Sequence, residues 1–88
     1  MSVVYFVIPC YNEEEVLPEA SKRMIAKLEQ LIQKGLASKE SRLLFVDDGS
    51  RDKTWELIAG LHEASPYVCG LKLSRNRGHQ YALLAGLL

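Results

Sequence analysis

The order of apolar and polar segments along the chain predicts alternating strands and helices. Residues 3–8 (VVYFVI) form a continuous β-branched and aromatic run, which is typical of a strand covered on both faces in a parallel sheet. Pro9 is expected to end this strand. Shorter apolar runs at residues 43–46 (LLFV) and 68–73 (VCGLKL) predict two further buried strands.

Three other segments have the composition or periodicity of helices. From about residue 14 to residue 34, apolar side chains recur at three- and four-residue steps and predict one apolar helix face. Gly35 is the expected C-terminal cap of this helix. Residues 52–64 predict a second helix, and the apolar residues 79–88 predict a third.

The predicted order of elements is therefore β-α-β-α-β-α. Because crossovers between parallel strands are right-handed and carry the helices, this order predicts a parallel sheet with helices on both faces. The fold class is α/β. At this length, residues 1–88 correspond to one half of a doubly wound, Rossmann-like domain and are interpreted as a single domain fragment.

Composition and charge exclude several classes of partner. The chain has 88 residues, with 11 Lys and Arg against 11 Asp and Glu, and so lacks the basic excess typical of nucleic-acid-binding proteins. Cys10 and Cys69 lie in or beside apolar runs and are interpreted as small buried hydrophobic residues in a reducing, cytoplasmic setting. The apolar run at residues 3–10 is too short to span a bilayer.

Polar clusters follow all three predicted strands. They are residues 11–15 (YNEEE), 47–50 (DDGS) and 75–80 (RNRGHQ). In parallel α/β sheets, ligands bind beyond the carboxyl ends of the strands. The sequence therefore predicts that these three clusters meet at one ligand site.

The acidic pair Asp47 and Asp48 has more than one interpretation. Its carboxylates can accept hydrogen bonds from a base N–H or a ribose hydroxyl. They can equally be turn residues, with Ser50 or Asp52 capping the following helix. A magnesium site, as in phosphoacceptor domains, would require another carboxylate after a neighbouring strand. The third strand is followed by Arg75 instead, which argues against that alternative.

The first cluster combines an aromatic residue, an amide and three carboxylates. The ring of Tyr11 can pack against a planar base, and Asn12 is suited to fix the loop by hydrogen bonds from side chain to backbone. Glu13, Glu14 and Glu15 are favourable at a helix start whatever the function, because they interact with the helix dipole.

The third cluster carries positive charge. Arg75 and Arg77 lie beside Gly78 at a predicted helix start, where they can face a phosphate or remain solvated surface charges. The chain contains neither GxGxxG nor GxxxxGK[ST], which argues against a dinucleotide-binding or P-loop enzyme.

Three linked strings carry a resemblance to a known family. Residues 8–14 (IPCYNEE), 46–54 (VDDGSRDKT) and 73–80 (LSRNRGHQ) resemble family-two inverting glycosyltransferases. Within that family they are most similar to polyprenyl-phosphate sugar transferases related to dolichyl-phosphate mannose synthase. The resemblance covers essentially the whole chain and implies the N-terminal, nucleotide-sugar-binding part of a glycosyltransferase A-type fold.

The resemblance implies nucleotide-binding roles in all three loops. The first loop would surround the base and ribose, the second would contact the base through Asp48 with support from Asp47, and the third would lie near the phosphates. Arg77 differs from the aromatic residue often found at its position in the family. The residues predicted to bind nucleotide are Pro9, Tyr11, Asn12, Glu13, Asp47, Asp48, Ser50, Arg75, Asn76 and Gly78.

For the whole enzyme, the resemblance implies inverting transfer of a sugar from a UDP- or GDP-sugar. The acceptor would be a polyprenyl phosphate or a glycan, at the cytoplasmic face of a membrane, with Mg or Mn as Lewis acid. The family's Asp-x-Asp motif and catalytic base lie beyond Leu88, so we expect no catalytic residue, metal ligand or activity within this chain. The alternatives are a nucleotidyltransferase and a non-catalytic, receiver-like scaffold domain.

The first strand is also expected to promote self-association. Doubly wound halves order their strands 3-2-1-4, so residues 3–8 would lie inside the sheet of a whole domain and be unpaired on one side here. An apolar strand edge without charge pairs readily with another chain. We therefore expect the 88-residue chain to form a dimer or a larger assembly, by pairing of these edges or by mutual burial of the last predicted helix, or else to be poorly soluble.

Overall fold

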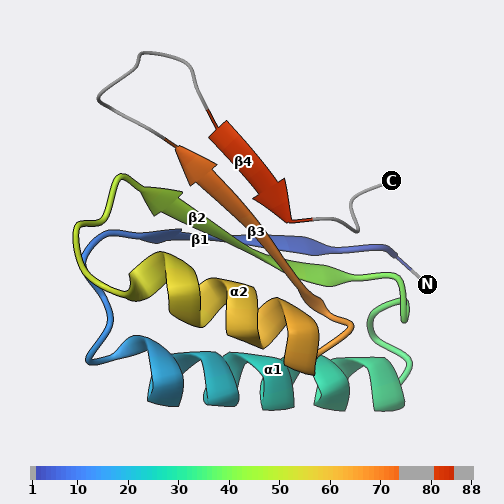
Figure 1. The fold of residues 1–88 in the computed structure, drawn as a ribbon. Coiled ribbons are helices and arrows are strands. Elements are labelled where there is room, and N and C mark those ends of the chain that lie inside the picture. Colours follow the sequence, from blue (N-terminus) through green and yellow to red (C-terminus); the bar gives the residue numbers. More distant parts are fainter. Residues whose placement is uncertain (1, 74–80, 85–88) are drawn as a thin grey trace.

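Three parallel strands alternate with two helices, and a fourth strand completes the sheet (Figure 1). The computed structural model describes residues 2–73 and the backbone of residues 81–84. The sheet order is β1-β2-β3-β4, with β1, β2 and β3 parallel and β4 antiparallel to β3. The elements are β1 (Tyr5–Cys10), α1 (Leu17–Gln33), β2 (Arg42–Asp48), α2 (Thr54–Ala64), β3 (Val68–Leu73) and β4 (Tyr81–Leu84).

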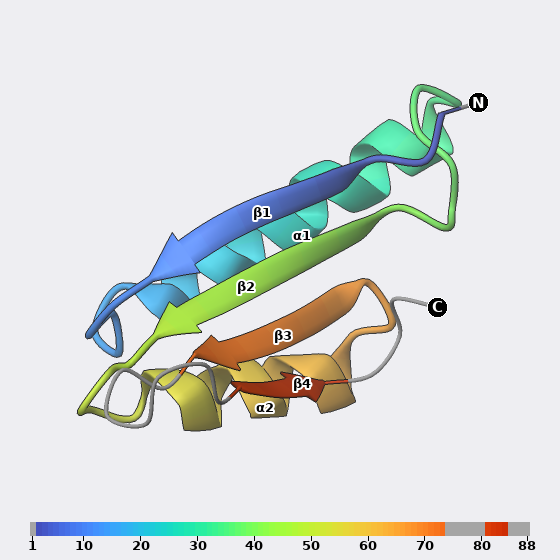
Figure 2. The ribbon, with the colours of Figure 1, turned by 90° about the horizontal axis from the view of Figure 1, so that it is seen from above.

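The predicted α/β class and the parallel arrangement of the first three strands are confirmed. Both described helices, however, lie on the same face of the sheet (Figures 1 and 2). The prediction of helices on both faces is therefore wrong for the described residues. The reason is geometric: the chain moves in one direction from β1 to β2 to β3, and right-handed crossovers in one direction place their helices on one face.

β1 runs through Pro9 to Cys10, so the prediction that Pro9 ends the strand is wrong. The backbone N–H of Arg42 donates to the carbonyl of Val4 at 3.0 Å. Because backbone groups alternate between the two sides of a strand, Val4 points toward β2 and Pro9 points away from it. The missing N–H of Pro9 therefore costs no bond to β2.

β1 also lies at the edge of the described sheet and is not covered on both faces, contrary to its sequence pattern. Its side chains at Tyr5, Phe6 and Val7 are 50%, 41% and 61% exposed. Among the described strands, β1 pairs with β2 alone.

The first helix ends as its sequence predicts. Gly35 has φ of 74°, in the left-handed region that favours glycine. The N–H of Gly35 donates to the carbonyl of Ile32, and the N–H of Leu36 donates to the carbonyl of Leu31 at 2.9 Å. This pair of bonds is a Schellman motif, and it satisfies the last carbonyls of α1.

Residues 81–84 form a strand, which corrects the helix predicted over residues 79–88. β4 pairs with β3 from Leu73 opposite Tyr81 to Gly70 opposite Leu84. This pairing satisfies backbone groups along the outer edge of β3, which a helix at residues 81–84 would leave without partners. The remainder of the predicted helix lies outside the described residues.

The core lies between the sheet and the two helices. In β2, every second residue is buried, because alternate side chains point toward the helices. Phe45, Ile58 and Leu28 are almost completely buried in one cluster. Cys10 and Cys69 are buried free thiols, as predicted. Among the described helices, none combines the length and the apolar character needed to cross a bilayer.

Candidate functional site

Two loops lie side by side at the carboxyl ends of β1 and β2. Residues 11–16 leave β1, and residues 49–53 leave β2. Because Cys10 pairs with Asp47, the two strands end next to one another, and the loops that follow them begin at the same edge of the sheet. Two of the three predicted polar clusters therefore meet. The third cluster, with Arg75, Asn76 and Gly78, lies outside the described residues.

Asn12 joins the two loops through both its backbone and its side chain. Its backbone N–H donates to the Ser50 hydroxyl at 2.8 Å, and its Oδ1 accepts from the backbone N–H of Arg51 at 2.9 Å. Asn12 has φ of 51°, a left-handed conformation that asparagine tolerates better than most residues. The prediction that Asn12 fixes the loop by side-chain to backbone hydrogen bonds is confirmed.

Two further backbone N–H groups of the first loop bond to side chains in the second loop and at the start of α2. The N–H of Glu13 donates to Thr54 Oγ1 at 2.8 Å, and that of Glu14 donates to Asp52 Oδ2 at 3.2 Å. Thr54 is fully buried. Backbone groups of the first loop are thus satisfied by the second loop and by the start of α2, so the two loops stabilise one another.

The start of α2 is organised by Asp52 and not by Ser50. Lys53 directly precedes α2 and its side chain makes no capping bond, so of the two predicted capping residues it is Asp52 that bonds to the first turn. Asp52 Oδ1 accepts hydrogen bonds from the N–H and the hydroxyl of Thr54. The Ser50 hydroxyl instead accepts a hydrogen bond from the backbone N–H of Asn12 in the first loop. Sequence reasoning missed the role of Thr54, although Asp-x-Thr before an apolar run is a recognisable helix start.

Asp47 lies under the second loop and is completely buried. Its Oδ1 accepts from the N–H of Ser50 at 3.1 Å, which closes a turn in which Gly49 has φ of 77°. Among the described residues, its Oδ2 has no hydrogen-bond partner. The interpretation of Asp47 as a turn residue is confirmed.

Asp48 points to the opposite face of the sheet. Successive side chains of a strand alternate, so Asp48 projects away from the helices while Asp47 faces them. The two carboxylates therefore cannot chelate one ion together. No set of three His, Cys, Asp or Glu side chains suited to a metal occurs among the described residues. The described part of the chain does not fit the divalent metal that the family resemblance implies.

Two titratable groups beside the loops have shifted pKa values. Burial raises the pKa of the Cys10 thiol to about 11, and the charges of Glu13 and Asp47 act in the same direction. Cys10 therefore remains a thiol at neutral pH and is unsuited to nucleophilic chemistry. Partial desolvation raises the pKa of Asp52, but hydrogen bonds from Thr54 and Glu14 outweigh it and lower the pKa below 3.8.

The remaining predicted site residues lie at the rim of these loops. Tyr11 is 46% exposed, and Pro9 is exposed beside it. Glu13 and Asp48 are partly buried. The edge thus carries an aromatic ring and carboxylates beside two loops that hydrogen bonds hold together.

Known proteins resemble this chain over nearly its whole length. The sequence model of glycosyl transferase family 2 matches residues 5–88. The chain is 51% identical over 85 residues to "Uncharacterized glycosyltransferase YkoT" of Bacillus subtilis, which covers 97% of this chain and 25% of that protein. It is 42% identical over 84 residues to undecaprenyl-phosphate 4-deoxy-4-formamido-L-arabinose transferase of Photorhabdus laumondii, covering 94% of this chain and 24% of that protein. The chain therefore spans about a quarter of the length of these relatives.

We predict that Thr54→Val destabilises the protein by about 1–3 kcal/mol, because the Glu13 N–H loses its partner at a fully buried side chain. Thr54→Ser is the matched control, since it keeps the hydroxyl and should cost about 1 kcal/mol for the lost methyl group. Urea unfolding of both variants measures the difference. Equal stability of Thr54→Val and wild type would contradict the proposed role of the hydroxyl.

We also predict a contribution of Asp52 to the pH dependence of stability. Its folded pKa lies below its ordinary value of 3.8, so the stabilisation is complete above that value and is lost as pH falls through the lower, folded pKa. The urea midpoint of wild type should therefore decrease more steeply on acidification below pH 3.8 than that of Asp52→Asn. Parallel pH profiles of the two proteins would show that Asp52 makes no such contribution.

Proposed function

The chain belongs to glycosyl transferase family 2, and from this premise we propose that its interlocked loops bind the nucleotide of a sugar-nucleotide donor. Its relatives include transferases named for an undecaprenyl-phosphate acceptor. In the whole enzyme, we propose, the sugar passes from a UDP- or GDP-sugar to a polyprenyl phosphate.

The observation that carries this proposal is the hydrogen bonding between the two loops. Asn12, Glu13 and Glu14 donate backbone N–H groups to side chains of residues 50–54. These bonds hold the loop that bears Tyr11 next to the end of β2, where Asp48 lies. A site whose geometry exists before the ligand arrives loses less conformational entropy on binding.

The proposed roles follow from the chemistry of each group. The Tyr11 ring packs against the base, and the Asp48 carboxylate accepts a hydrogen bond from a base N–H. Pro9 and Glu13 flank the base and ribose. Asp47 and Ser50 hold the turn beneath them.

The third loop completes the proposed nucleotide site. Arg75, Asn76 and Gly78 would face the phosphates, where a guanidinium and backbone N–H groups bind anionic oxygens. Their contribution rests on the sequence and on the family, because these residues lie outside the described part of the chain.

Catalysis belongs to the whole enzyme and not to these 88 residues. We propose in-line displacement at the anomeric carbon with inversion, at the cytoplasmic face of a membrane. A divalent metal would supply charge stabilisation for the leaving diphosphate when bound. Its ligands would lie outside the described residues, which hold no suitable cluster. The 88-residue chain alone is proposed to be inactive.

The first prediction from this proposal concerns Asp48. In the whole enzyme, Asp48→Ala should weaken UDP or GDP binding by about 1–3 kcal/mol, because a donor on the base loses its acceptor. Glu63→Ala is the control, since Glu63 is an exposed acid near the far end of α2. Calorimetric titration with each nucleotide measures the effect. Unchanged affinity in Asp48→Ala would remove it from the site, and indifference of the wild type to both nucleotides would favour a scaffold domain.

The second prediction concerns metal. Because Asp47 and Asp48 point to opposite faces of the sheet, the 88-residue chain should bind neither Mn²⁺ nor Mg²⁺ tightly. Calorimetry with each ion tests this directly. A stoichiometric site of micromolar affinity would contradict the prediction and would support the phosphoacceptor alternative.

A further inference from the structure

Two side chains at the start of α2, those of Asp52 and Thr54, form a hydrogen-bonded cluster with the backbone of the first loop. Thr54 Oγ1 accepts from the Glu13 N–H at 2.8 Å, and the same hydroxyl donates to Asp52 Oδ1. Asp52 Oδ1 also accepts from the Thr54 N–H, and Asp52 Oδ2 accepts from the Glu14 N–H at 3.2 Å. The hydroxyl thus links a backbone N–H to a carboxylate, an arrangement in which each hydrogen bond polarises and strengthens the next.

Glu13 connects this Asp52–Thr54 pair to both helices through its backbone. Its N–H reaches Thr54 at the start of α2. Its carbonyl accepts from the N–H groups of Val16 and Leu17, at 3.1 and 2.8 Å, where α1 begins. Leu17 is almost completely buried in the core. The first loop is therefore fixed relative to α1 and α2 at a single residue.

The Asp52–Thr54 pair is less accessible to water than the other contact between the loops. Thr54 is completely buried, and Asp52 is partly buried. The bonds that join Asn12 to Ser50 and Arg51 are exposed, so water can replace them with little loss of free energy. A backbone N–H beside a buried side chain has no such replacement. The pair therefore holds the loop more strongly than the contacts of Asn12 do.

Neither member of the pair is placed to touch a ligand itself. Both carboxylate oxygens of Asp52 accept hydrogen bonds from the protein. The Thr54 hydroxyl is buried, and it both donates and accepts within the cluster. Tyr11 and Asn12, on the loop that the pair holds, are exposed. The pair can therefore act on a ligand only through the position of this loop.

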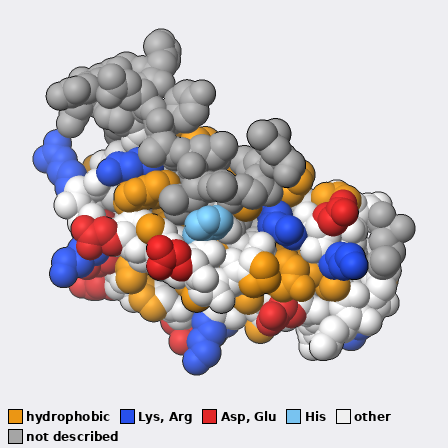
Figure 3. Space-filling model, turned by 45° about the vertical axis from the view of Figure 1, so that its right-hand side comes forward, with side chains coloured by type: hydrophobic (Ala, Val, Ile, Leu, Met, Phe, Trp, Pro, Cys, Tyr) orange, Lys and Arg blue, Asp and Glu red, His pale blue; other side chains and the backbone are white. Residues whose placement is uncertain are grey.

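Long-range charge offers an anionic nucleotide little help on this chain. The formal net charge is zero. On the face shown in Figure 3, acidic and basic side chains are interspersed, without a field of one sign. Binding to the described loops therefore depends on how accurately their groups are placed before the ligand arrives.

We propose that Asp52 and Thr54 are positioning residues that hold residues 11–14 in the conformation that binds nucleotide, an inference that rests on the proposed function. When the loop is released, only the molecules with the loop in place are competent to bind. The apparent dissociation constant rises as that fraction falls. Because linkage is reciprocal, a bound nucleotide also strengthens the hold of the pair on the loop.

The first experiment measures binding of UDP and GDP to the whole enzyme by calorimetric titration. Thr54→Val keeps the shape of the side chain but removes the hydroxyl. It should raise the dissociation constant of the nucleotide that binds by about fivefold or more, with an unchanged number of sites per molecule. Thr54→Ser retains a hydroxyl and should bind like wild type.

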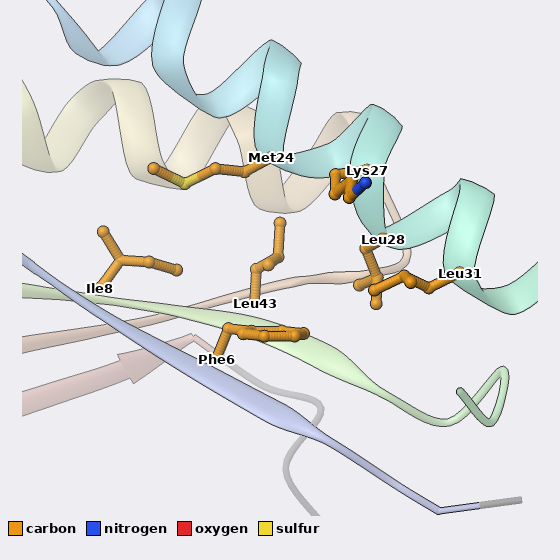
Figure 4. Close-up of a pocket in the computed structure, with 7 residues that line it drawn as sticks. All are labelled: Phe6, Ile8, Met24, Lys27, Leu28, Leu31 and Leu43. Carbon is orange, nitrogen blue, oxygen red and sulfur yellow. The ribbon is translucent and has the colours of Figure 1, made fainter. Parts of the chain in front are cut away.

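Leu31→Ala is the control for a general loss of stability. Leu31 lines an apolar pocket of about 180 Å³ between β1 and α1 (Figure 4), near the end of α1 that lies away from the loops. Removing this side chain loses apolar contacts, so the thermal midpoint should fall while nucleotide affinity stays unchanged. Far-UV circular dichroism checks that each variant is folded.

Asp52→Asn is a second variant, which decides the test if Thr54→Val does not fold. It keeps the size of the side chain but exchanges one acceptor oxygen for an amide group that only donates. One of the hydrogen bonds from Glu14 or Thr54 is then lost, and nucleotide binding should again weaken.

The second experiment follows amide hydrogen exchange in residues 11–16 of the whole enzyme. Thr54→Val should accelerate exchange in this segment by about fivefold or more and leave exchange in β2 unchanged, because only the loop opens. Saturating UDP or GDP should slow exchange in the same segment of the wild type.

The outcomes separate this inference from the proposed function. A wild type that binds neither UDP nor GDP would refute the proposed function, and this inference with it. If wild type binds, then unchanged affinity in a folded Thr54→Val or Asp52→Asn would overturn this inference alone. An equal loss of affinity in Leu31→Ala, or a failure of Thr54→Ser to restore binding, would do the same. Unchanged exchange of residues 11–16 in Thr54→Val would also overturn it, whatever the result with nucleotide.

Discussion

Parallel pairing of β1 with β2 is the constraint on which the rest of the structure depends. The strands match from Tyr5 opposite Arg42 to Cys10 opposite Asp47. That register requires α1 as the crossover and places it against the sheet. It also brings the loop after Cys10 beside the loop after Asp48, close enough for backbone N–H groups of one to reach side chains of the other. A shift by one residue would reverse which side chains face the helices.

Alternation along β2 places two consecutive acidic residues on opposite faces of the sheet. Asp47 faces the helices, is fully buried and holds the turn through the Ser50 N–H. Asp48 faces the other side and is only partly buried. The two consecutive acidic residues therefore lie in different surroundings, one under the loop and one on the opposite face of the sheet. The same alternation explains why an adjacent pair of carboxylates does not form a metal site here.

The pairing of β1 with β2 also explains why the loops that follow the two strands bond to one another. The chain corresponds to about a quarter of the length of its relatives. The hydrogen bonds described between its two loops join residues 12–14 to residues 50–54, and the pairing of β1 with β2 holds the loops side by side.

The sequence by itself determined the features that depend on neighbouring residues. Apolar periodicity located α1, α2 and the first three strands, Gly35 marked the end of α1, and Asn12 was identified as a loop-fixing residue. The tertiary structure alone decided what depends on distant partners. Residues 81–84 became a strand because the edge of β3 lay open to pair with them. Pro9 stayed within β1 because its missing N–H faces outward, and Thr54 acquired its role because β1 places the Glu13 N–H against it. Local patterns record propensity and burial. The pairing of β1 with β2 and the contacts between the two loops join residues about 40 positions apart, and the pairing of β4 depends on the position of β3, so no local pattern encodes them.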